Sequence, residues 1–361
     1  MKDTNIRAGC QHDLAFPFHG SQTPAQRLSA ISAFMEEQGL EPDYYASGTA
    51  SKLLEDKAAN LFGREAALWF PTGTMAQGTA ARIYSAKTGS REILLHPTSH
   101  LLLHENEGYH HAHGLTSKQL GEWQSVITAD CLDGNSACAF VELPQRHNGG
   151  LLPSWDQLTQ LKDNANSQGL ALHLDGARIW SCRPHYGNRT LAEITAGFSS
   201  IYVSLYKDIG AVGGAMLIGD ADFIAEAEKW RSRLGGLMVE PWIMVCDALR
   251  LLDQRLDQMT AFVERAKEIA SQLRPINGVV LEPDLPQVNM FHLKLPCAMH
   301  KAEKARNMVA EQTGVWLATR FWNYEGEHQC SMEVTFGETA TKIPDNEFVN
   351  AVKLLVQLCT G

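Results

Sequence analysis

Short apolar segments alternate with longer helical patterns between residues 65 and 220, and this alternation restricts the fold more than any other feature of the chain. Helices between consecutive strands are typical of a mostly parallel sheet that is covered by helices on both faces. In open sheets of this kind, ligands bind at the carboxyl ends of the strands. The sequence therefore predicts an α/β fold with its functional site at that edge. The predicted strands are 65–70, 91–96, 136–143, 169–175, 199–205 and 212–219.

The pattern changes after residue 220, where long helical stretches lead into a smaller α+β segment. A length of 361 residues suits two domains. We therefore predict an N-terminal arm over 1–20, which we expect to be irregular, a large domain over 21–255 and a small C-terminal domain over 256–361. Further helices are predicted at 24–39, 49–63, 154–169, 221–235, 240–273 and 345–358, and further strands near 278–282, 288–294, 315–319 and 331–336.

Composition excludes several classes of protein. With 31 Lys and Arg against 41 Asp and Glu, the formal net charge is −10, which disfavours general binding to nucleic acid or to anionic membranes. The eight cysteines are scattered without a Cys-x-x-Cys pair, as expected for reduced thiols in a cytosolic protein. No apolar run reaches the roughly 18–20 residues that span a bilayer, and the first residues lack the apolar core of a signal peptide. We expect a cytoplasmic protein with neither nucleic acid nor membrane as partner.

Three short segments contain residues that could carry chemistry. The first is Thr72-Gly73-Thr74, between a predicted strand and a predicted helix. A glycine and two hydroxyls at a helix N-terminus can present N–H and O–H donors to a phosphate group. Taken alone, the same residues are more typical of an ordinary capped helix, because Ser and Thr are common N-caps.

The second segment is His-Leu-Asp-Gly-Ala-Arg, in which Asp175 ends a buried strand. A buried carboxylate needs a partner, and the carboxyl end of a parallel strand is a usual place for function. Asp175 could instead pair with Arg178 to hold a turn.

The third segment is Ser204-Leu-Tyr-Lys207, which precedes a glycine-rich stretch. Burial could lower the pKa of a lysine at this position, as Schiff-base chemistry requires. Lys207 could also be a surface lysine at the end of a strand. The glycine-rich stretch leads into a strand pattern and lacks the G-x-G-x-x-G spacing, so it does not indicate a dinucleotide site.

The order of these segments is more informative than any one of them. A hydroxyl-bearing turn at residue 72 comes first, a strand-end aspartate follows about 100 residues later, and a lysine follows 32 residues after that. Pyridoxal 5'-phosphate needs all three: a helix N-terminus for its phosphate, a carboxylate for its pyridine nitrogen and a lysine for its aldehyde. The sequence therefore predicts this cofactor.

The same residues resemble a known family, the low-specificity threonine aldolases of the β-eliminating lyase group. The resemblance extends over nearly the whole chain and is strongest in FGREAALWFPTGTMAQ, ELPQRHNGGLLP, ALHLDGARIW and SLYKDIGAVGGAMLIG. It implies the aspartate-aminotransferase-like fold (fold type I), with a large domain built on a mostly parallel sheet and a smaller C-terminal α+β domain. It also implies a homodimer or homotetramer whose active sites combine two chains.

The resemblance assigns a role to individual residues of this chain. Asp175 corresponds to the partner of the pyridine nitrogen, Arg178 lies beside the ring oxygen, and Lys207 is the Schiff-base lysine. His100 stacks on the cofactor ring, and Tyr45 reaches the site across the dimer interface. The implied cofactor-binding residues are Thr72, Gly73, Thr74, His100, Asp175, Arg178, Ser204 and Lys207; the catalytic ones are Lys207, His100 and His147; the substrate-binding ones are Tyr45, His147 and Arg320.

The chain departs from the family's pattern at three places. Met332 stands where the family carries the arginine that binds the substrate carboxylate, and methionine cannot replace a bidentate arginine. Arg320, at the end of the preceding predicted strand, is the candidate replacement. Val239 stands at the position of a second family arginine, and Tyr206-Lys207-Asp208 replaces the usual Ser-Lys-Gly.

Histidines are concentrated between residues 96 and 113. His100 and His104 are four residues apart and would share one face of a helix. The His-His-x-His run could bind a divalent metal, or its members could be solvated side chains near an anionic cofactor. We predict no metal site. The six histidines are His96, His100, His104, His110, His111 and His113.

The implied reaction cleaves the Cα–Cβ bond of a 3-hydroxy amino acid, such as threonine or allo-threonine, to glycine and an aldehyde. His147 or His100, or a water they hold, would take the proton from the β-hydroxyl, since histidine titrates near neutral pH. The alternatives are β-elimination, racemisation or transamination of an amino acid, or a cofactor-binding homologue without catalysis.

Overall fold

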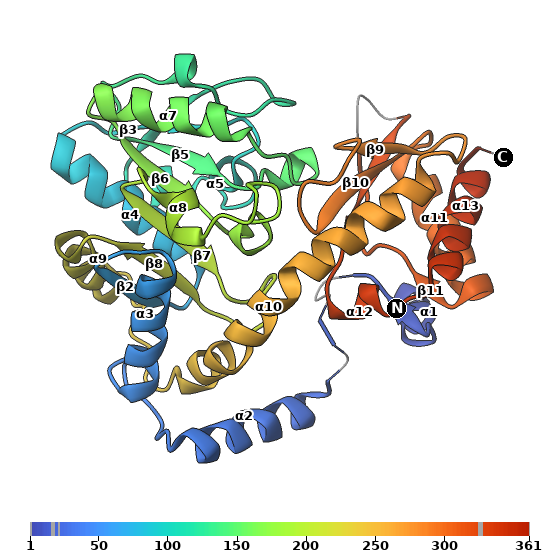
Figure 1. The fold of residues 1–361 in the computed structure, drawn as a ribbon, viewed down its shortest axis with the longest axis horizontal. Coiled ribbons are helices and arrows are strands. Elements are labelled where there is room, and N and C mark those ends of the chain that lie inside the picture. Colours follow the sequence, from blue (N-terminus) through green and yellow to red (C-terminus); the bar gives the residue numbers. More distant parts are fainter. Residues whose placement is uncertain (1, 16–18, 21, 324–327, 361) are drawn as a thin grey trace. The chain divides into compact units, whose positions relative to one another are not determined.

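The computed structural model describes residues 2–15, 19–20, 22–323 and 328–360. By its internal contacts the chain divides into two compact units. We call residues 22–145 and 152–257 the large unit, and residues 1–21, 146–151 and 258–361 the C-terminal unit. Helix α10 (Trp242–Leu273) runs from the first into the second (Figure 1). In the described ranges, no helix is long and apolar enough to cross a membrane. The predicted domain boundaries stay a prediction.

The large unit is built on a seven-stranded sheet with the strand order β2-β8-β7-β6-β5-β3-β4. Strand β8 runs antiparallel to both of its neighbours, whereas the other pairs are parallel. The predicted mostly parallel sheet is therefore confirmed. Strand β4 was not predicted, because its residues Thr-Ser-Lys-Gln are polar and partly exposed. The strands are β2 (Ala66–Phe70), β3 (Glu92–Leu95), β4 (Thr116–Gln119), β5 (Cys138–Glu142), β6 (Ala171–Asp175), β7 (Ser200–Ser204) and β8 (Ala215–Gly219).

Helix α4 (Gly73–Thr88) packs against the middle of this sheet. The Thr72 side chain caps its first turn and Gly89 ends it in a left-handed conformation. Buried alanines on α4, among them Ala76 and Ala80, join a core with Phe140 and Tyr202 from the sheet. The other helices of the unit are α2 (Pro24–Gln38), α3 (Thr49–Leu61), α5 (His100–Leu103), α6 (Gly108–His111), η1 (Ala129–Cys131), α7 (Trp155–Ser167), η3 (Ile179–Ser181), α8 (Leu191–Thr195) and α9 (Ala221–Arg233).

Helix α2 is the least covered long helix of the large unit. Thr23 and Gln26 form a capping box at its start, and Gly39 ends it. Of its residues, Ile31 is the one that is buried. In Figure 1 it stands apart from the sheet and is joined to α3 by a loop. Packing on the sheet therefore does not hold α2 in place.

The C-terminal unit contains an antiparallel sheet with the order β12-β13-β10-β9 and a parallel pair of β1 with β11. The predicted strand at 315–319 is reduced to Val315–Trp316, because only these residues pair with β1. Residues 2–8 are helical, where an irregular arm was predicted. Helix α11 was not predicted. The elements are α1 (Lys2–Ala8), β1 (His12–Asp13), η2 (Arg146–Asn148), β9 (Val280–Glu282), β10 (Met290–Leu295), α11 (Met299–Thr313), β11 (Val315–Trp316), β12 (Trp322–Asn323), β13 (Cys330–Thr335), α12 (Glu338–Thr341) and α13 (Asp345–Thr360).

Segment 146–151 comes from the middle of the sequence but packs within the C-terminal unit. Arg146 Nε lies 2.6 Å from Glu333 Oε2 on β13. A Cβ atom at Gly149 would lie 1.8 Å from the Glu282 carbonyl oxygen, so only glycine allows this approach. The ion pair and the close approach attach the segment to the small sheet.

Candidate active site

A buried carboxylate without a cationic partner lies at the carboxyl end of β6. Asp175 is 4% exposed, and its Oδ1 accepts a hydrogen bond from the Ala177 N–H at 3.1 Å. Its Oδ2 accepts one from Gln77 Nε2 on α4 at 3.0 Å. No lysine or arginine in the described part of the chain forms an ion pair with it. A buried carboxylate is costly unless it is paired, so this position suits a ligand that brings an N–H or a positive charge.

The N-terminus of α4 lies beside the same strands. A Cβ atom at Gly73 would lie 2.2 Å from the hydroxyl oxygen of Tyr202. Tyr202 is on β7, where its backbone pairs in register with Asp175 of β6. The Thr72 Oγ1 accepts from the Met75 N–H at 3.3 Å. The first N–H groups of a helix have no intrahelical acceptor, so those of Gly73 and Thr74 are available to an anion. Glycine at this position therefore lets the Tyr202 ring pack directly against the start of α4.

Two tyrosines and an arginine connect these groups. Burial raises the pKa of Tyr202 well above its usual value, and the nearby Tyr206, Asp175 and Glu105 raise it further. Burial also raises the pKa of Tyr206, whereas Arg178 acts in the opposite direction. Both phenols are therefore neutral and able to donate hydrogen bonds at neutral pH. Arg178 and Asp175 both lie near Tyr206, without an ion pair between them among the described residues.

Lys207 follows the end of the neighbouring strand. Ser204, the last residue of β7, is fully buried, and Lys207 Nζ is half-buried at 5.5 Å from the centre of the Tyr206 ring. The loop after Lys207 closes on itself: the Ala211 N–H donates to the Leu205 carbonyl at 2.9 Å. Thr72, Gly73, Asp175, Ser204 and Lys207 therefore meet at one edge of the sheet.

His100 begins the short helix α5 and has a partner that the sequence did not predict. Its Nδ1 lies 2.8 Å from Oε1 of Glu105, whose side chain is 3% exposed. Glu105, Thr72 and Thr74 line one cavity of about 270 Å³. A five-residue separation gives no periodic signal for such a pair, since it forms only because the chain turns after α5. Gln77 was also missed, although it is a buried polar residue one turn after Gly73.

Three other histidines of the 96–113 cluster have polar partners outside the cluster. His96 contacts Thr98 and the Glu122 carbonyl, and burial lowers its pKa. His110 contacts the Leu115 carbonyl at 2.9 Å, and His111 lies 3.4 Å from Glu107. Over the residues that the structure describes, no three His, Cys, Asp or Glu side chains are grouped to hold a metal ion.

Tyr45 is on the surface of the large unit. It is 52% exposed, and both it and Ala46 have left-handed backbone conformations, with φ of 56° and 51°. The Tyr45 N–H donates to the carbonyl of Val239 at 3.0 Å. The departure at Val239 is therefore next to Tyr45. Left-handed conformations of non-glycine residues are strained and are frequent at functional sites.

Three predicted residues belong to the C-terminal unit. His147 is in η2, next to the Arg146–Glu333 ion pair. Met332 is fully buried and pairs with Leu293, so its side chain is part of the core of the small sheet. Arg320 is exposed in the loop between β11 and β12, because the strand expected to carry it is shorter than predicted.

The residues present fit pyridoxal phosphate. Asp175 offers a buried carboxylate to a pyridine N–H, and the first N–H groups of α4, beside the cavity that Thr72 and Thr74 line, can receive a phosphate. Lys207 follows the strand next to that of Asp175.

Comparison with known sequences agrees with this arrangement. A family model described as β-eliminating lyase matches residues 21–296. A low-specificity L-threonine aldolase of Escherichia coli strain K12 is 28% identical over 310 residues, which are 80% of this chain and 89% of that protein. Low-specificity L-threonine aldolase 1 of Arabidopsis thaliana is 25% identical and covers 82% of this chain and 86% of its own length.

Solved structures extend the likeness to the whole chain. A candidate L-allo-threonine aldolase of Listeria monocytogenes has a TM-score of 0.89 and 30% identity, with 98% of each chain covered. A candidate aromatic amino acid β-eliminating lyase/threonine aldolase of Exiguobacterium sp. has a TM-score of 0.90 and 31% identity, over 98% of this chain and 99% of that one. Serine palmitoyltransferase of Sphingomonas wittichii, at 14% identity and a TM-score of 0.69 over 92% and 82% of the two chains, shares the fold alone. The predicted fold type I is confirmed.

Proposed function

This chain belongs to the β-eliminating lyase family, and from that premise we propose that it is a pyridoxal-phosphate-dependent carbon–carbon lyase that cleaves a 3-hydroxy amino acid. Its substrate is threonine or a close relative such as allo-threonine, and its products are glycine and an aldehyde. The observation that carries the proposal is the buried Asp175 carboxylate, which has a hydrogen bond from Gln77 but no cation. Relatives with the matching names cover most of the chain.

The cofactor's contacts follow from the chemistry of each group. The phosphate binds at Thr72, Gly73 and Thr74, with Ser204 as a further hydroxyl donor. Asp175 would hold the pyridine nitrogen in its protonated form, and Arg178 would bind the ring oxygen. Lys207 would hold the aldehyde carbon, and His100 would cover the face of the ring. When bound, the cofactor supplies a ring that accepts the electron pair of the broken Cα–Cβ bond.

The Glu105–His100 pair supplies a base of defined orientation. The Glu105 carboxylate accepts from Nδ1–H of His100, so Nε2 carries the lone pair in the neutral ring. That nitrogen takes the proton of the substrate's β-hydroxyl, and the carboxylate stabilises the imidazolium that results. His147 is the second candidate for this step, either directly or through a water.

The substrate's own carboxylate requires a cation that Met332 does not provide. We assign this role to Arg320, which is exposed on the loop between β11 and β12. Tyr45 is a further substrate contact, contributed by a second copy of the chain.

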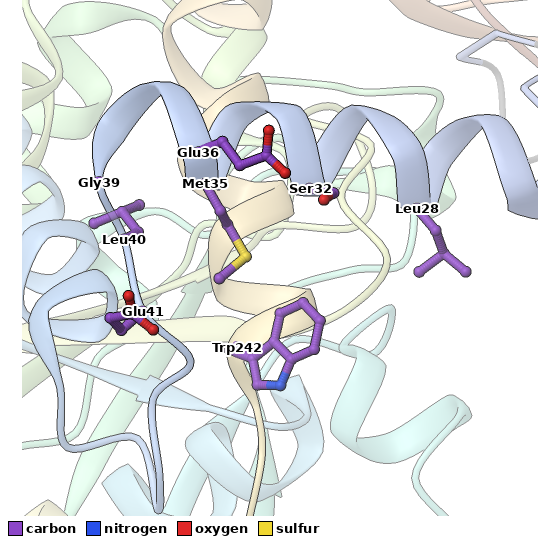
Figure 2. A pocket seen from close by; sticks show the side chains of 8 residues that line it. All are labelled: Leu28, Ser32, Met35, Glu36, Gly39, Leu40, Glu41 and Trp242. Carbon is purple, nitrogen blue, oxygen red and sulfur yellow. The ribbon is translucent and has the colours of Figure 1, made fainter.

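The protein assembles as a cytoplasmic homodimer or homotetramer with shared sites. Exposed apolar side chains gather around Tyr45, whose backbone is bonded to Val239; Tyr44 and Met238 are the sequence neighbours of these two and are also exposed. Figure 2 shows a second surface with apolar side chains, a pocket lined by Leu28 and Met35 of α2 and Trp242 of α10 together with polar residues such as Glu36. Its volume is about 500 Å³. Large apolar surfaces of this kind mark protein interfaces.

A second pyridoxal-phosphate reaction remains a specific alternative. Buried Met332 removes the family's carboxylate clamp, and which bond at Cα breaks depends on how the substrate is oriented over the ring. β-Elimination, racemisation and transamination differ from aldol cleavage in that orientation alone.

The test is a screen of 3-hydroxy amino acids that measures aldehyde release and glycine formation in parallel with the visible spectrum of the bound cofactor. We expect threonine or allo-threonine to give acetaldehyde and glycine in equal amounts. Lys207→Ala should lose both turnover and the visible band of lysine-bound cofactor. Pyruvate, ammonia or an altered enantiomer as product would establish the alternative reactions, and a yellow protein that turns over no amino acid would overturn the enzyme assignment.

A further inference from the structure

The loop that follows Lys207 is held from outside the sheet. Residues 205–214 connect β7 to β8, and Gly210 has a left-handed backbone with φ of 78°. A Cβ atom at Gly213 would lie 2.8 Å from the Met244 sulfur on α10. The loop therefore packs directly on the first turns of α10.

Asp247, one turn after Met244 on the same helix, binds the backbone of the loop through its side chain. It is fully buried, and its Oδ2 accepts from the Val212 N–H at 2.9 Å. Its Oδ1 accepts from Arg250 Nη2 at 2.7 Å. A carboxylate that is both buried and paired has a fixed orientation, so the Val212 N–H is held at a defined point.

Arg27 of α2 completes the contact. Its Nε donates to Asp247 Oδ2 at 2.9 Å, and its Nη2 donates to both Asp247 Oδ2 and the Gly210 carbonyl oxygen. The guanidinium thus bridges the carboxylate on α10 and the backbone of the loop. The planar fork of arginine makes such a bridge rigid, which a lysine ammonium would not.

The contacted backbone groups of the loop lie three and five residues after Lys207. The two residues that hold them, Arg27 and Asp247, are 220 positions apart in the sequence. With Leu205 bonded to Gly214 and Ala211 at the base of the loop, both ends are closed by the backbone, and Arg27 and Asp247 hold the segment between. Because α2 is little buried otherwise, the Arg27 contact also ties this surface helix to the active-site lysine.

We propose that Arg27 and Asp247 are positioning residues for Lys207: they fix the loop after it, and so set the direction in which its amine meets the cofactor. The inference rests on the proposed role of Lys207. Neither residue touches the reacting groups, so their loss should weaken cofactor attachment and turnover rather than substrate affinity.

The test compares Arg27→Met with Lys57→Met, which removes an ion pair between α3 and α10 (Lys57 with Asp253) that does not reach the loop. In the cofactor-free protein, we expect hydrogen exchange of residues 208–214 to be about tenfold faster in Arg27→Met and unchanged in Lys57→Met. With cofactor, Arg27→Met should lower kcat about tenfold with KM for the amino acid nearly unchanged, and should need more cofactor to reach the same visible absorbance.

Arg27→Lys and Asp247→Asn complete the series. Arg27→Lys keeps the charge but not the fork, so exchange in the loop should be intermediate. Asp247→Asn should match Arg27→Met or exceed it; if this variant does not fold, the partly exposed Arg27 still decides the question. Unchanged loop exchange and unchanged cofactor absorbance in Arg27→Met would overturn the inference. Faster loop exchange in a protein that cleaves no 3-hydroxy amino acid would leave the contact standing and reject the proposed function instead.

Discussion

Two buried aspartates of the large unit have opposite surroundings. Asp247 pairs with two arginines and a backbone N–H, whereas Asp175 accepts from an amide side chain and a backbone N–H and has no cation. Both are almost completely buried. The Asp247 carboxylate finds its hydrogen-bond partners within the chain and holds them in place. Asp175 has no positive partner among the residues that the structure describes, and a buried carboxylate of this kind suits a ligand that brings an N–H or a positive charge.

Removing the charge of Asp175 should have the largest effect and tests most directly whether Asp175 and Asp247 have different roles. Asp175→Asn keeps the shape and can still accept from Gln77 but cannot hold a pyridine nitrogen protonated. We expect kcat to fall about 10²–10³-fold, as for the loss of one partner of a buried charge pair. The cofactor's absorbance and the rate of product formation measure it.

A matched control for Asp175→Asn is Asp253→Asn, which removes an exposed carboxylate of the same unit. We expect it to have no effect on kcat. If the two variants were equally active, Asp175 would be a structural residue like Asp247.

Glu105 is intermediate between the two aspartates, since its side chain pairs with a histidine that can gain a charge. Glu105→Gln removes the negative charge that stabilises the imidazolium, although its amide oxygen can still accept from Nδ1–H, so we expect turnover to fall about tenfold. The loss should be in kcat rather than in KM for the amino acid, because the pair acts on the proton transfer.

Glu107 offers the control for this change, because it is an exposed carboxylate that faces His111 at 3.4 Å. Glu107→Gln should leave kcat unchanged. Unchanged turnover in Glu105→Gln would remove the Glu105–His100 pair from the proton transfer and leave His147 as the candidate.

The smallest effect is expected at Glu55, which acts on stability alone. Its Oε1 accepts from the Trp69 N–H of β2 at 3.0 Å, and burial raises its pKa from 4.5 to about 6. The folded protein therefore binds this proton more tightly than the unfolded chain, and stability falls as the pH rises from 4.5 to about 6. Glu55→Gln should gain about 1–2 kcal/mol of unfolding free energy at pH 8 and little below pH 4.5.

Urea titrations at the two pH values measure this gain, with Glu228→Gln as the exposed control near the same Arg231. An equal change in unfolding free energy at both pH values would mean that the ionisation of Glu55 does not destabilise the folded protein. Arg231 donates to the Trp69 carbonyl at 2.7 Å, so both backbone groups of this residue on the outermost strand are occupied by side chains.

Sequence patterns predicted the parts of the molecule that local chemistry determines. The strands ending at Phe70, Asp175 and Ser204 have continuous apolar runs, and Thr72 and Gly73 have the chemistry of a helix start, so the site's edge of the sheet was predictable. The reversed direction of β8 was not, because its sequence is as apolar as that of a parallel strand.

Contacts between distant residues were outside the reach of sequence patterns. Arg27 is in an amphipathic surface helix and Asp247 in a long one, and nothing in either pattern joins them. Gln77 and Glu105 were missed because one polar residue among small ones and a pair five residues apart have no periodicity. Helix α11 was missed because its sequence is mostly polar and because only its C-terminal end, at Gly314, has a cap signal.

The attachment of segment 146–151 to the small sheet has a consequence for synthesis on the ribosome. Arg146 and Gly149 rest on Glu333 and Glu282, which emerge from the ribosome more than 130 residues later. Until those residues are synthesised, segment 146–151 stays exposed, although the strands before and after it in the sequence, β5 and β6, are already able to pair. A fragment that stops near residue 257 would retain the seven strands of the large sheet yet leave this segment, and His147 with it, without the surface that shapes it.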